Sequence, residues 1–264
     1  MSAADTASVK RTAILLAGRR PGVDPMAQAE GVALKALIPI AGEPMVARVA
    51  RTLLAAPEIA SIVVLTQDVD VIAAALPADP RIRVERSGAG IAGSVSAVAG
   101  GAFAPWPLFV TTADHALLDP QTVSAFLAAV AAAPADIAFG MVERRIVHAR
   151  FPHNRRTCLK FRGGWWTGAN LFALNGEGAR TALSLWSEVE QERKKGWKLV
   201  ARFGPWLLLR ALTRTITLQA GVAAAARRIG IVARMIPLAD PLAAVDVDKP
   251  SDLALVRQVF EGKA

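Results

Sequence analysis

The chain has 264 residues, 53% of them hydrophobic, which is enough for the core of one large α/β domain or of two small ones. The single cysteine, Cys158, excludes an internal disulfide framework. The N-terminus lacks the apolar core of a secretory signal, and no stretch has the roughly 18 apolar residues of a membrane-spanning helix, so we expect a cytoplasmic protein. The net charge of +9 favours an anionic partner, whether a nucleotide, a nucleic acid or a membrane surface.

Strand and helix patterns alternate along the first half of the chain. Short apolar or β-branched runs predict strands at residues 13–16, 61–65, 107–112 and 137–142, and alternation of apolar and charged residues predicts one at 81–85. Helical spacing of apolar residues predicts helices at 46–54, 70–76 and 120–133, and the glycine-rich stretch 87–101 predicts a turn followed by a short helix. This alternation indicates a largely parallel sheet covered by helices on both faces.

The loop after the first predicted strand combines glycines with cations. Gly18, Arg19, Arg20 and Gly22 follow that strand, and Lys35 comes next, just ahead of a second turn rich in proline and glycine. Glycines let backbone N–H groups turn toward an anion, and arginines add fixed positive charge. We therefore expect a cradle for a polyphosphate.

A second glycine-rich turn follows the third predicted strand. Gly88, Gly90 and Gly93 match the G-x-G-x-x-G form of a dinucleotide-binding turn. The turn lies in the third strand–helix unit, however, and the helix after it is short, so we favour binding of a nucleotide base over binding of NAD, with a plain turn as the other alternative. Ligands of parallel sheets bind beyond the carboxyl ends of the strands, so we expect this turn, the Gly18 loop and Asp114 to share one site.

Asp114 lies at the end of the strand predicted at 107–112. It could cap the helix that follows, but Asp119, directly before Pro120, is the better N-cap, which leaves Asp114 for another role. We expect the neighbouring His115 to face solvent or to make a hydrogen bond rather than to bind a metal ion.

Residues 143–164 are rich in cations and poor in acids. Arg155, Arg156 and Lys160 would suit a phosphate group, although a solvated basic face is an equal alternative. His148 and His153 lie in the same region but lack a third ligand for a metal site.

Several stretches resemble the MobA-like nucleotidyltransferase superfamily. They are LAGRRPG at residues 16–22, KALIPIAGEPM at 35–45, TTADHALL at 111–118, WWTGANLF at 165–172 and AAVDVDKPSDL at 243–253. The sequence departs from the family pattern where Arg19 replaces a loop glycine, where the gap from Gly18 to Lys35 is longer, and where alanines flank Asp114 in place of glycine and proline.

The resemblance implies a three-layer, Rossmann-like fold of the GT-A type, with a mostly parallel mixed sheet and a basic helical insertion. Residues 1–264 would form a single domain with the insertion at 180–239. The implied reaction is transfer of an NMP from CTP or GTP to a phosphorylated small-molecule or lipid-related acceptor, with release of pyrophosphate and with Mg²⁺ as cofactor.

The resemblance also implies site residues. It implies that Asp114 and Asp248 bind the metal ion, with Asp246 as the second choice after Asp248. It also implies that Lys35, Arg19 and Arg20 offset the negative charge that grows on the departing pyrophosphate. The residues expected at the nucleotide are Leu16, Ala17, Gly18, Gly22, Gly88, Gly90 and Ser94. The residues expected at the acceptor are Arg155, Arg156, Lys160 and Asn170.

Residues 193–239 contain ten lysines and arginines, no acidic residue, and the aromatic residues Trp197, Phe203 and Trp206. This pattern is typical of a helix lying on the inner membrane face, and also of a basic helical hairpin packed on its own domain. Nucleic-acid binding is not expected, since no recognised module accompanies the charge. A nucleotide-sugar-dependent glycosyltransferase and a non-catalytic nucleotide-binding protein remain alternatives for the whole chain.

Overall fold

A computed structural model describes residues 9–19, 22–88, 90–154, 156–191 and 204–263. Arg20, Arg155 and residues 193–203 of the basic segment, all part of the predictions above, lie outside the described residues.

An eight-stranded mixed sheet forms the centre of the molecule, in the order β10-β7-β9-β6-β1-β4-β5, with β8 paired to β9. The strands are β1 (Arg11–Leu16), β4 (Ile59–Thr66), β5 (Ile82–Arg86), β6 (Leu108–Thr112), β7 (Ile137–Glu143), β8 (Leu159–Phe161), β9 (Gly164–Leu174) and β10 (Ala233–Leu238). The pairs β1–β4, β1–β6, β4–β5 and β7–β10 are parallel, whereas β9 runs antiparallel to β6, β7 and β8. The mostly parallel mixed sheet of the predicted α/β fold is therefore confirmed.

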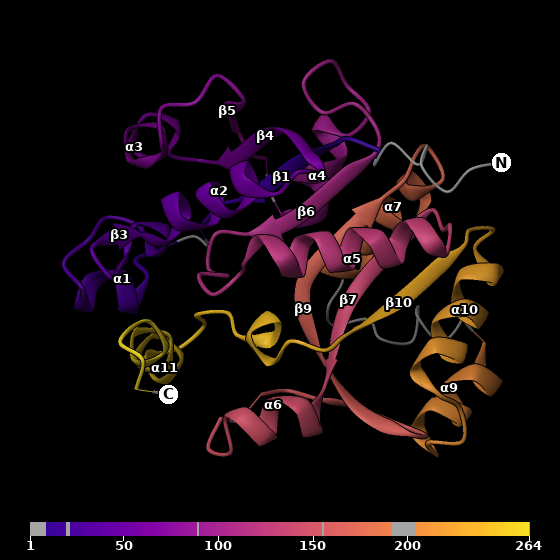
Figure 1. Cartoon of the computed structure of the whole chain (residues 1–264). Coiled ribbons are helices and arrows are strands. Elements are labelled where there is room, and N and C mark those ends of the chain that lie inside the picture. Colours follow the sequence, from indigo (N-terminus) through magenta and orange to yellow (C-terminus); the bar gives the residue numbers. More distant parts are fainter. Residues whose placement is uncertain (1–8, 20–21, 89, 155, 192–203, 264) are drawn as a thin grey trace, which may run out of the picture.

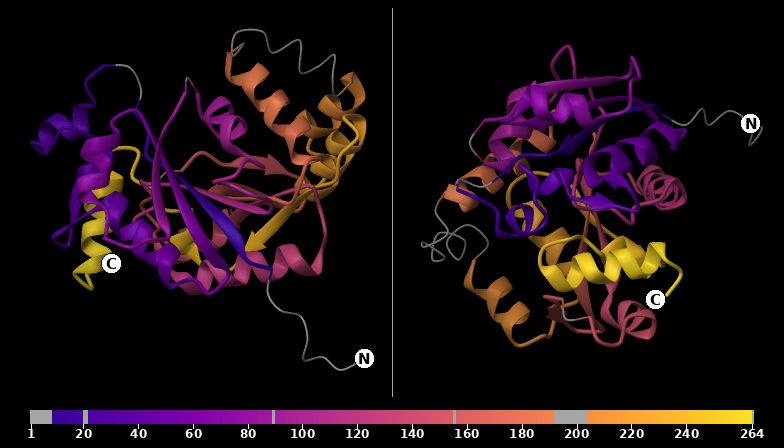
Figure 2. Two further views of the ribbon diagram at one scale, coloured as in Figure 1. Left: turned by 90° about the horizontal axis from the view of Figure 1, so that it is seen from above. Right: turned by 90° about the vertical axis from the view of Figure 1, so that its left-hand side faces the viewer.

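Helices cover both faces of the sheet (Figures 1 and 2). Along β1, Ala13 and Leu15 join one buried apolar cluster while Ile14 joins another, because successive side chains of a strand point to opposite faces. The first cluster includes side chains of α2 (Met45–Ala55), α5 (Pro120–Ala132) and α11 (Pro250–Phe260), and the second includes side chains of α4 (Ile91–Val98) and α7 (Ala179–Gln191). The result is three layers with an apolar core on each side of the sheet.

The remaining described elements are α1 (Pro25–Ala29), η1 (Lys35–Leu37), β2 (Pro39–Ile40), β3 (Glu43–Pro44), α3 (Val69–Ala75), α6 (Arg144–Arg150), α9 (Pro205–Leu212), α10 (Leu218–Arg228) and η2 (Pro241–Ala244). Helices α9 and α10 lie at the opposite end of the molecule from α1 and α11 (Figure 1). Among the described helices, none is both long enough and apolar enough to span a bilayer.

Two differences from the sequence predictions concern the second half of the chain. Residues 233–238 of the expected helical insertion form the edge strand β10, paired in parallel with β7, so the described helical part ends at Arg228. Helix α6 follows β7 directly, where only a basic region was predicted. The predicted N-cap is confirmed, because the Asp119 carboxylate accepts a hydrogen bond from the Thr122 backbone N–H at 2.8 Å.

Candidate active site

The parallel strands place three predicted features along one edge of the sheet. The Gly18 loop follows β1, Asp114 follows β6, and the Gly88 turn follows β5. Strands β6 and β1 are neighbours, and the Ala113 N–H donates to the Leu16 carbonyl oxygen at 2.9 Å. The start of the Gly18 loop therefore lies beside Asp114.

The segment between η2 and α11 adds two more carboxylates. Val245 and Val247 are fully buried, and the Val247 N–H donates to the Asp114 carbonyl oxygen at 3.0 Å. In an extended segment the alternate side chains point away from the buried ones, which directs Asp246 and Asp248 out of the core. This packing brings residues more than 130 positions apart in the chain to one place.

Lys35, at the start of η1, links two of the carboxylates. Its Nζ donates to Asp114 Oδ2 at 2.7 Å and to Asp248 Oδ1 at 3.4 Å. Burial disfavours the charged ammonium, but attraction to Asp114 and Asp248 outweighs it and raises the pKa of Lys35. Burial and the neighbouring Asp246 raise the pKa of Asp248, against the opposing effect of Lys35. Carboxylates outnumber cations here, so the cluster attracts a further cation.

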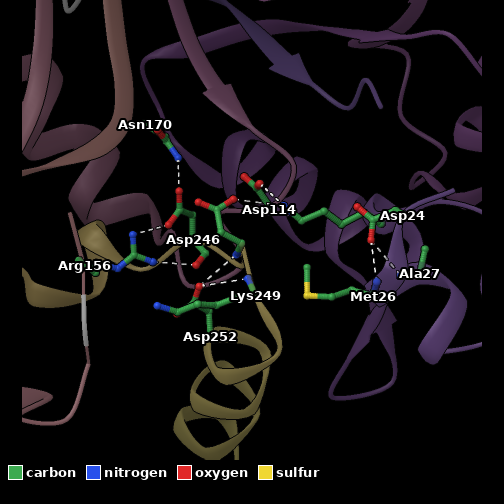
Figure 3. Close-up of polar contacts among 11 residues, drawn as sticks. Asp24, Met26, Ala27, Asp114, Arg156, Asn170, Asp246, Lys249 and Asp252 are labelled. Carbon is green, nitrogen blue, oxygen red and sulfur yellow. Dashed lines mark hydrogen bonds and ion pairs between the residues drawn. The ribbon is translucent and has the colours of Figure 1, made fainter. Parts of the chain in front are cut away.

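Asp246 is held by two other side chains (Figure 3). Its Oδ2 accepts a hydrogen bond from Asn170 Nδ2 at 2.7 Å, and it forms an ion pair with Arg156, whose Nη2 also donates to the Asp246 carbonyl oxygen at 2.7 Å. Asn170 has a φ of 51°, at a place where the register between β7 and β9 shifts. Asparagine tolerates this left-handed conformation, and such a bulge re-aims a side chain out of the strand pattern.

His115 lies in the middle of this cluster, so of the two predicted environments, solvent or a hydrogen bond, the first is wrong. Its side chain is only 1% exposed, and burial lowers its pKa, so the imidazole is neutral at pH 7. Among the described residues, neither ring nitrogen has a hydrogen bond of ordinary geometry, although the Leu242 backbone interacts with the ring. The sequence carries no signal for this burial.

The Gly18 loop is folded against residues that follow β4. The Arg19 backbone N–H donates to Gln67 Oε1 at 2.8 Å, and the Arg19 guanidinium pairs with Asp68 at 2.9 Å. A β-carbon at Gly18 would lie 3.2 Å from two atoms of the Gln67 side chain, so the loop passes close to that residue. Sequence reasoning missed Gln67 and Asp68, which carry no motif of their own.

The turn from Gly88 to Ser94 is closed by its own contacts. Ser94 Oγ donates to the Gly90 carbonyl oxygen at 2.6 Å and lies 3.3 Å from that of Gly88. Gly90 has a φ of 78° and precedes the first residue of α4. Because the Ser94 hydroxyl proton is donated to a carbonyl oxygen of the turn itself, backbone groups of this turn, rather than the Ser94 O–H, would bind a nucleobase.

A pocket of about 500 Å³ opens between α6, the loop that follows it and β9. Its lining residues are mostly polar or basic: Arg144, Val147, His148, Pro152, His153, Asn154, Arg156, Cys158 and Thr167. Arg156 belongs both to this pocket and to the ion pair with Asp246, so the pocket adjoins the carboxylate cluster. Lys160, predicted at the acceptor, is instead exposed, with its Nζ 4.2 Å from the ring centroid of Trp165.

The family profile of the MobA-like NTP transferase domain matches residues 14–184, which is more than half of the chain. The chain is a MobA-like NTP transferase. Among curated protein sequences, none matches this transferase significantly.

Solved structures share the transferase's fold along nearly its whole length. A hypothetical transferase from Thermus thermophilus is 31% identical, with a TM-score of 0.77, over 93% of this chain and 100% of that one. A CMP:2-keto-3-deoxy-manno-octonic acid synthetase complexed with CTP has a TM-score of 0.61 at 16% identity, over 97% and 100%. The 4-diphosphocytidyl-2C-methyl-D-erythritol synthase of Anaerococcus prevotii has a TM-score of 0.60 at 8% identity, over 96% and 99%. The last two similarities concern the fold alone.

The donor set of this transferase suits a divalent cation that is partly ligated by substrate. Among the described residues, no three His, Cys, Asp or Glu side chains are arranged to hold a metal ion by themselves. Asp114 Oδ1, however, is buried without a hydrogen-bond partner in the part of the chain that the structure describes, and Asp248 is 67% exposed beside it. Mg²⁺ is typically bound by one or two carboxylates together with phosphate oxygens and water, so Asp114 and Asp248 fit this ion better than Asp246 does.

Proposed function

We propose that this transferase moves an NMP from CTP or GTP to a phosphorylated small-molecule or lipid-related acceptor, with Mg²⁺ as cofactor. The observation that carries the proposal is the contact of Lys35 with both Asp114 and Asp248, which come from distant parts of the chain. An ammonium that close to two carboxylates, at the carboxyl edge of the sheet, suits a magnesium–triphosphate complex.

In the proposed reaction, an acceptor phosphate oxygen attacks the α-phosphorus in line. One P–O bond forms to the acceptor as the bond to the β-phosphate oxygen breaks, and pyrophosphate leaves with that electron pair. The attacking phosphate is already ionised at pH 7, so no side-chain base is needed. The work of the protein is to position both substrates and to balance charge.

Named side chains have separate roles in this proposal. Lys35 and Arg19 offset charge on the departing pyrophosphate, and Arg20 of the same loop would add to them. Bound to Asp114 and Asp248, Mg²⁺ would polarise phosphate oxygens of the nucleotide. The backbone at Gly18 and Gly22 would face the phosphates, and that at Gly88 and Gly90 the base. Leu16 and Ala17 would support this loop from the sheet, since the Leu16 carbonyl oxygen accepts from Ala113 and the Ala17 N–H donates to Leu65.

The basic pocket is the proposed acceptor site. Arg144 supplies a guanidinium group for bidentate contact with a phosphate, Arg156 adds positive charge while its Nη atoms stay on Asp246, and His148 and His153 add donors nearby. Asn170 and Arg156 hold Asp246 between this pocket and the metal ligands. Arg155, from the same loop, belongs to the proposal by its place in the sequence alone.

A pyrophosphate-release screen tests the proposal by crossing four nucleoside triphosphates with a panel of phosphorylated acceptors. CTP is the first nucleotide to test, because the synthetase structure with this fold holds CTP. We expect one pair to give sustained release that EDTA abolishes and Mg²⁺ restores. Release of a nucleoside diphosphate from a nucleotide sugar would indicate a glycosyltransferase instead, and release that is insensitive to EDTA would exclude the metal assignment.

Paired variants make the test specific. Asp114→Asn removes one ligand charge, and we expect it to lower the rate at least about 10²–10³-fold, the scale found for preorganised electrostatic groups. Asp79→Asn, which changes a partly exposed carboxylate paired with Arg81, is the matched control and should leave the rate unchanged. Equal rates in the two variants would overturn the site.

The proposal also places the enzyme in the cytoplasm. Nucleoside triphosphates are available in the cytoplasm, and a lipid-related acceptor would require peripheral contact with the inner membrane face through residues 193–239.

A further inference from the structure

We propose that the exposed side of α9 docks on an anionic bilayer and holds the acceptor pocket next to the membrane surface. The inference about docking stands on α9 and its surroundings alone. The inference about the acceptor rests on the proposed function.

The net charge of the chain is concentrated in one segment. Residues 193–239 contain ten of the 31 lysines and arginines and none of the 22 acidic residues. The rest of the chain has 21 cations against 22 acids and is therefore almost neutral. An anionic surface would attract this segment in particular, rather than the molecule as a whole.

Helix α9 exposes a stripe of large apolar side chains within that segment. Trp206 is 67% exposed, Leu209 48% and Leu212 79%. They are spaced three residues apart and so share one side of the helix. None of the residues of α9 is buried, so the helix leaves its most apolar side chains to the outside. Clustered exposed apolar residues mark an interaction site.

Helix α9, which carries this stripe, packs against the rest of the domain. Helix α10 packs on β10 and on α9, and the buried side chains of Ile216 and Leu218 anchor the connection between the two helices. The Arg162 N–H, at the β8–β9 turn, donates to the Ile216 carbonyl oxygen at 3.0 Å. The connection between α9 and α10 is therefore fixed to the turn of the β8–β9 hairpin, and α9 lies at the same end of the molecule as α10 (Figure 1).

Composition favours a bilayer as the occupant. Tryptophan and leucine beside arginine are typical of helices in the interfacial layer, where the indole ring and the aliphatic part of basic side chains suit a boundary between water and lipid. Arg210 lies within α9 and the exposed Arg214 follows it, where they can meet lipid phosphates. A second copy of the same face would bring like charges together, which opposes self-association.

The hairpin connects this face to the proposed acceptor pocket. Cys158, just before β8, and Thr167 on β9 line the pocket, while Leu159 and Trp165 of the same hairpin are 51% and 37% exposed. Docking through α9 would therefore bring the pocket close to lipid headgroups. The acceptor class that this arrangement selects is a phosphate monoester on a lipid or on a lipid-bound headgroup.

Cosedimentation with vesicles tests the docking face. The full chain is mixed with phosphatidylcholine vesicles, with and without phosphatidylglycerol, at low and at high salt. We expect binding only to the vesicles that contain phosphatidylglycerol, and loss of that binding at high salt, because the Debye length shortens. The variant with Trp206→Ser, Leu209→Ser and Leu212→Ser should bind at least about tenfold more weakly, since apolar burial supports interfacial binding.

The matched control is Val71→Ser, which changes an exposed apolar residue of α3, far from α9. We expect it to bind vesicles like the unaltered chain. Absence of binding, equal binding to neutral vesicles, or binding that the triple variant retains would each overturn the proposal. So would a preference for nucleic acid over vesicles, or a dimer in light scattering that the triple variant abolishes.

A second measurement separates this inference from the proposed function. Pyrophosphate release with a soluble phosphorylated acceptor should be the same in the triple variant and in the unaltered chain. If vesicle binding fails while release with soluble acceptors is normal, docking is wrong and nucleotidyl transfer stands. If the chain binds vesicles but no acceptor supports pyrophosphate release, the docking proposal holds and the proposed nucleotidyl transfer is wrong.

Discussion

Replacement of Lys35 by methionine should separate catalysis from stability most clearly. The change keeps an unbranched apolar side chain, one atom shorter, and removes the charge that faces Asp114 at 2.7 Å and Asp248 at 3.4 Å. Within the described part of the chain, Asp114 would then have no hydrogen-bond partner for either carboxylate oxygen, since its Oδ1 is already buried without one. Asp114, Asp246 and Asp248 would then lie close together without the Lys35 ammonium, with Arg156 still paired to Asp246.

The size of the stability effect follows from burial. The side chains of Lys35 and Asp114 are 24% and 21% exposed, so the pair is half-buried. An exposed ion pair contributes about 0–1 kcal/mol, and removing one partner of a buried pair costs about 3–5 kcal/mol, so the cost here should lie between these values. We expect the free energy of unfolding to fall by about 2 kcal/mol, as measured by urea denaturation. Because the pKa of Lys35 is raised, this contribution is present at neutral pH and is lost only as pH rises beyond the ordinary value of 10.5.

The effect on turnover should be larger than the effect on stability and independent of it. We expect Lys35→Met to slow pyrophosphate release about 10²–10³-fold. Adding Asp114→Asn removes the uncompensated charge, so the double variant should regain most of the lost stability and none of the lost rate. Near-normal release by Lys35→Met, or recovery of release in the double variant, would show that the pair is structural only. Lys263→Met, which removes an exposed lysine paired with Glu261, is the control and should change neither quantity.

Three further substitutions probe the fold. Arg257→Ala removes two hydrogen bonds to Glu30, at 3.0 and 2.6 Å, and should cost about 1 kcal/mol at neutral pH. Since the hydrogen bond from Arg257 lowers the pKa of Glu30, this difference should shrink as pH falls below 4.5, and a constant difference in urea melts would contradict the pairing. Asp119→Ala should cost about 1 kcal/mol through loss of the N-cap of α5, and an unchanged unfolding midpoint would refute that role. Gly140→Ala would place a β-carbon 2.9 Å from Leu238 Cδ1 and should cost about 1–3 kcal/mol, to be checked as a lower melting temperature.

Local patterns along the chain were sufficient for much of the fold. Apolar runs predicted β1, β4, β6 and β7 to within about two residues, because buried parallel strands are apolar on both faces, and alternation along residues 81–85 predicted β5 equally closely. Pro120 after Asp119 marked the start of α5, since proline fits the first turn of a helix and aspartate accepts its free N–H groups. The motifs around Lys35 and Asp114 indicated the family, and the family match confirms it.

Tertiary packing decided the order of the strands in the sheet and the burial of His115, which local patterns did not predict. The position of β9 between β6 and β7, and of β10 at the edge, depends on strand pairing between distant segments, for which a local pattern holds no information. His115 is buried because the segment after η2 packs beside Asp114, and its own neighbours in the sequence do not reveal that cover.

The sequence by itself therefore determined the kinds of elements, their order and the residue types able to bind a metal–nucleotide complex. The tertiary structure decided which of those residues meet. Asp248 meets Lys35 because Val245 and Val247 are buried in the core and the Val247 N–H donates to the Asp114 carbonyl oxygen. Apolar burial that supports such contacts is a property of the assembled core, so it cannot be read from any single stretch of the chain.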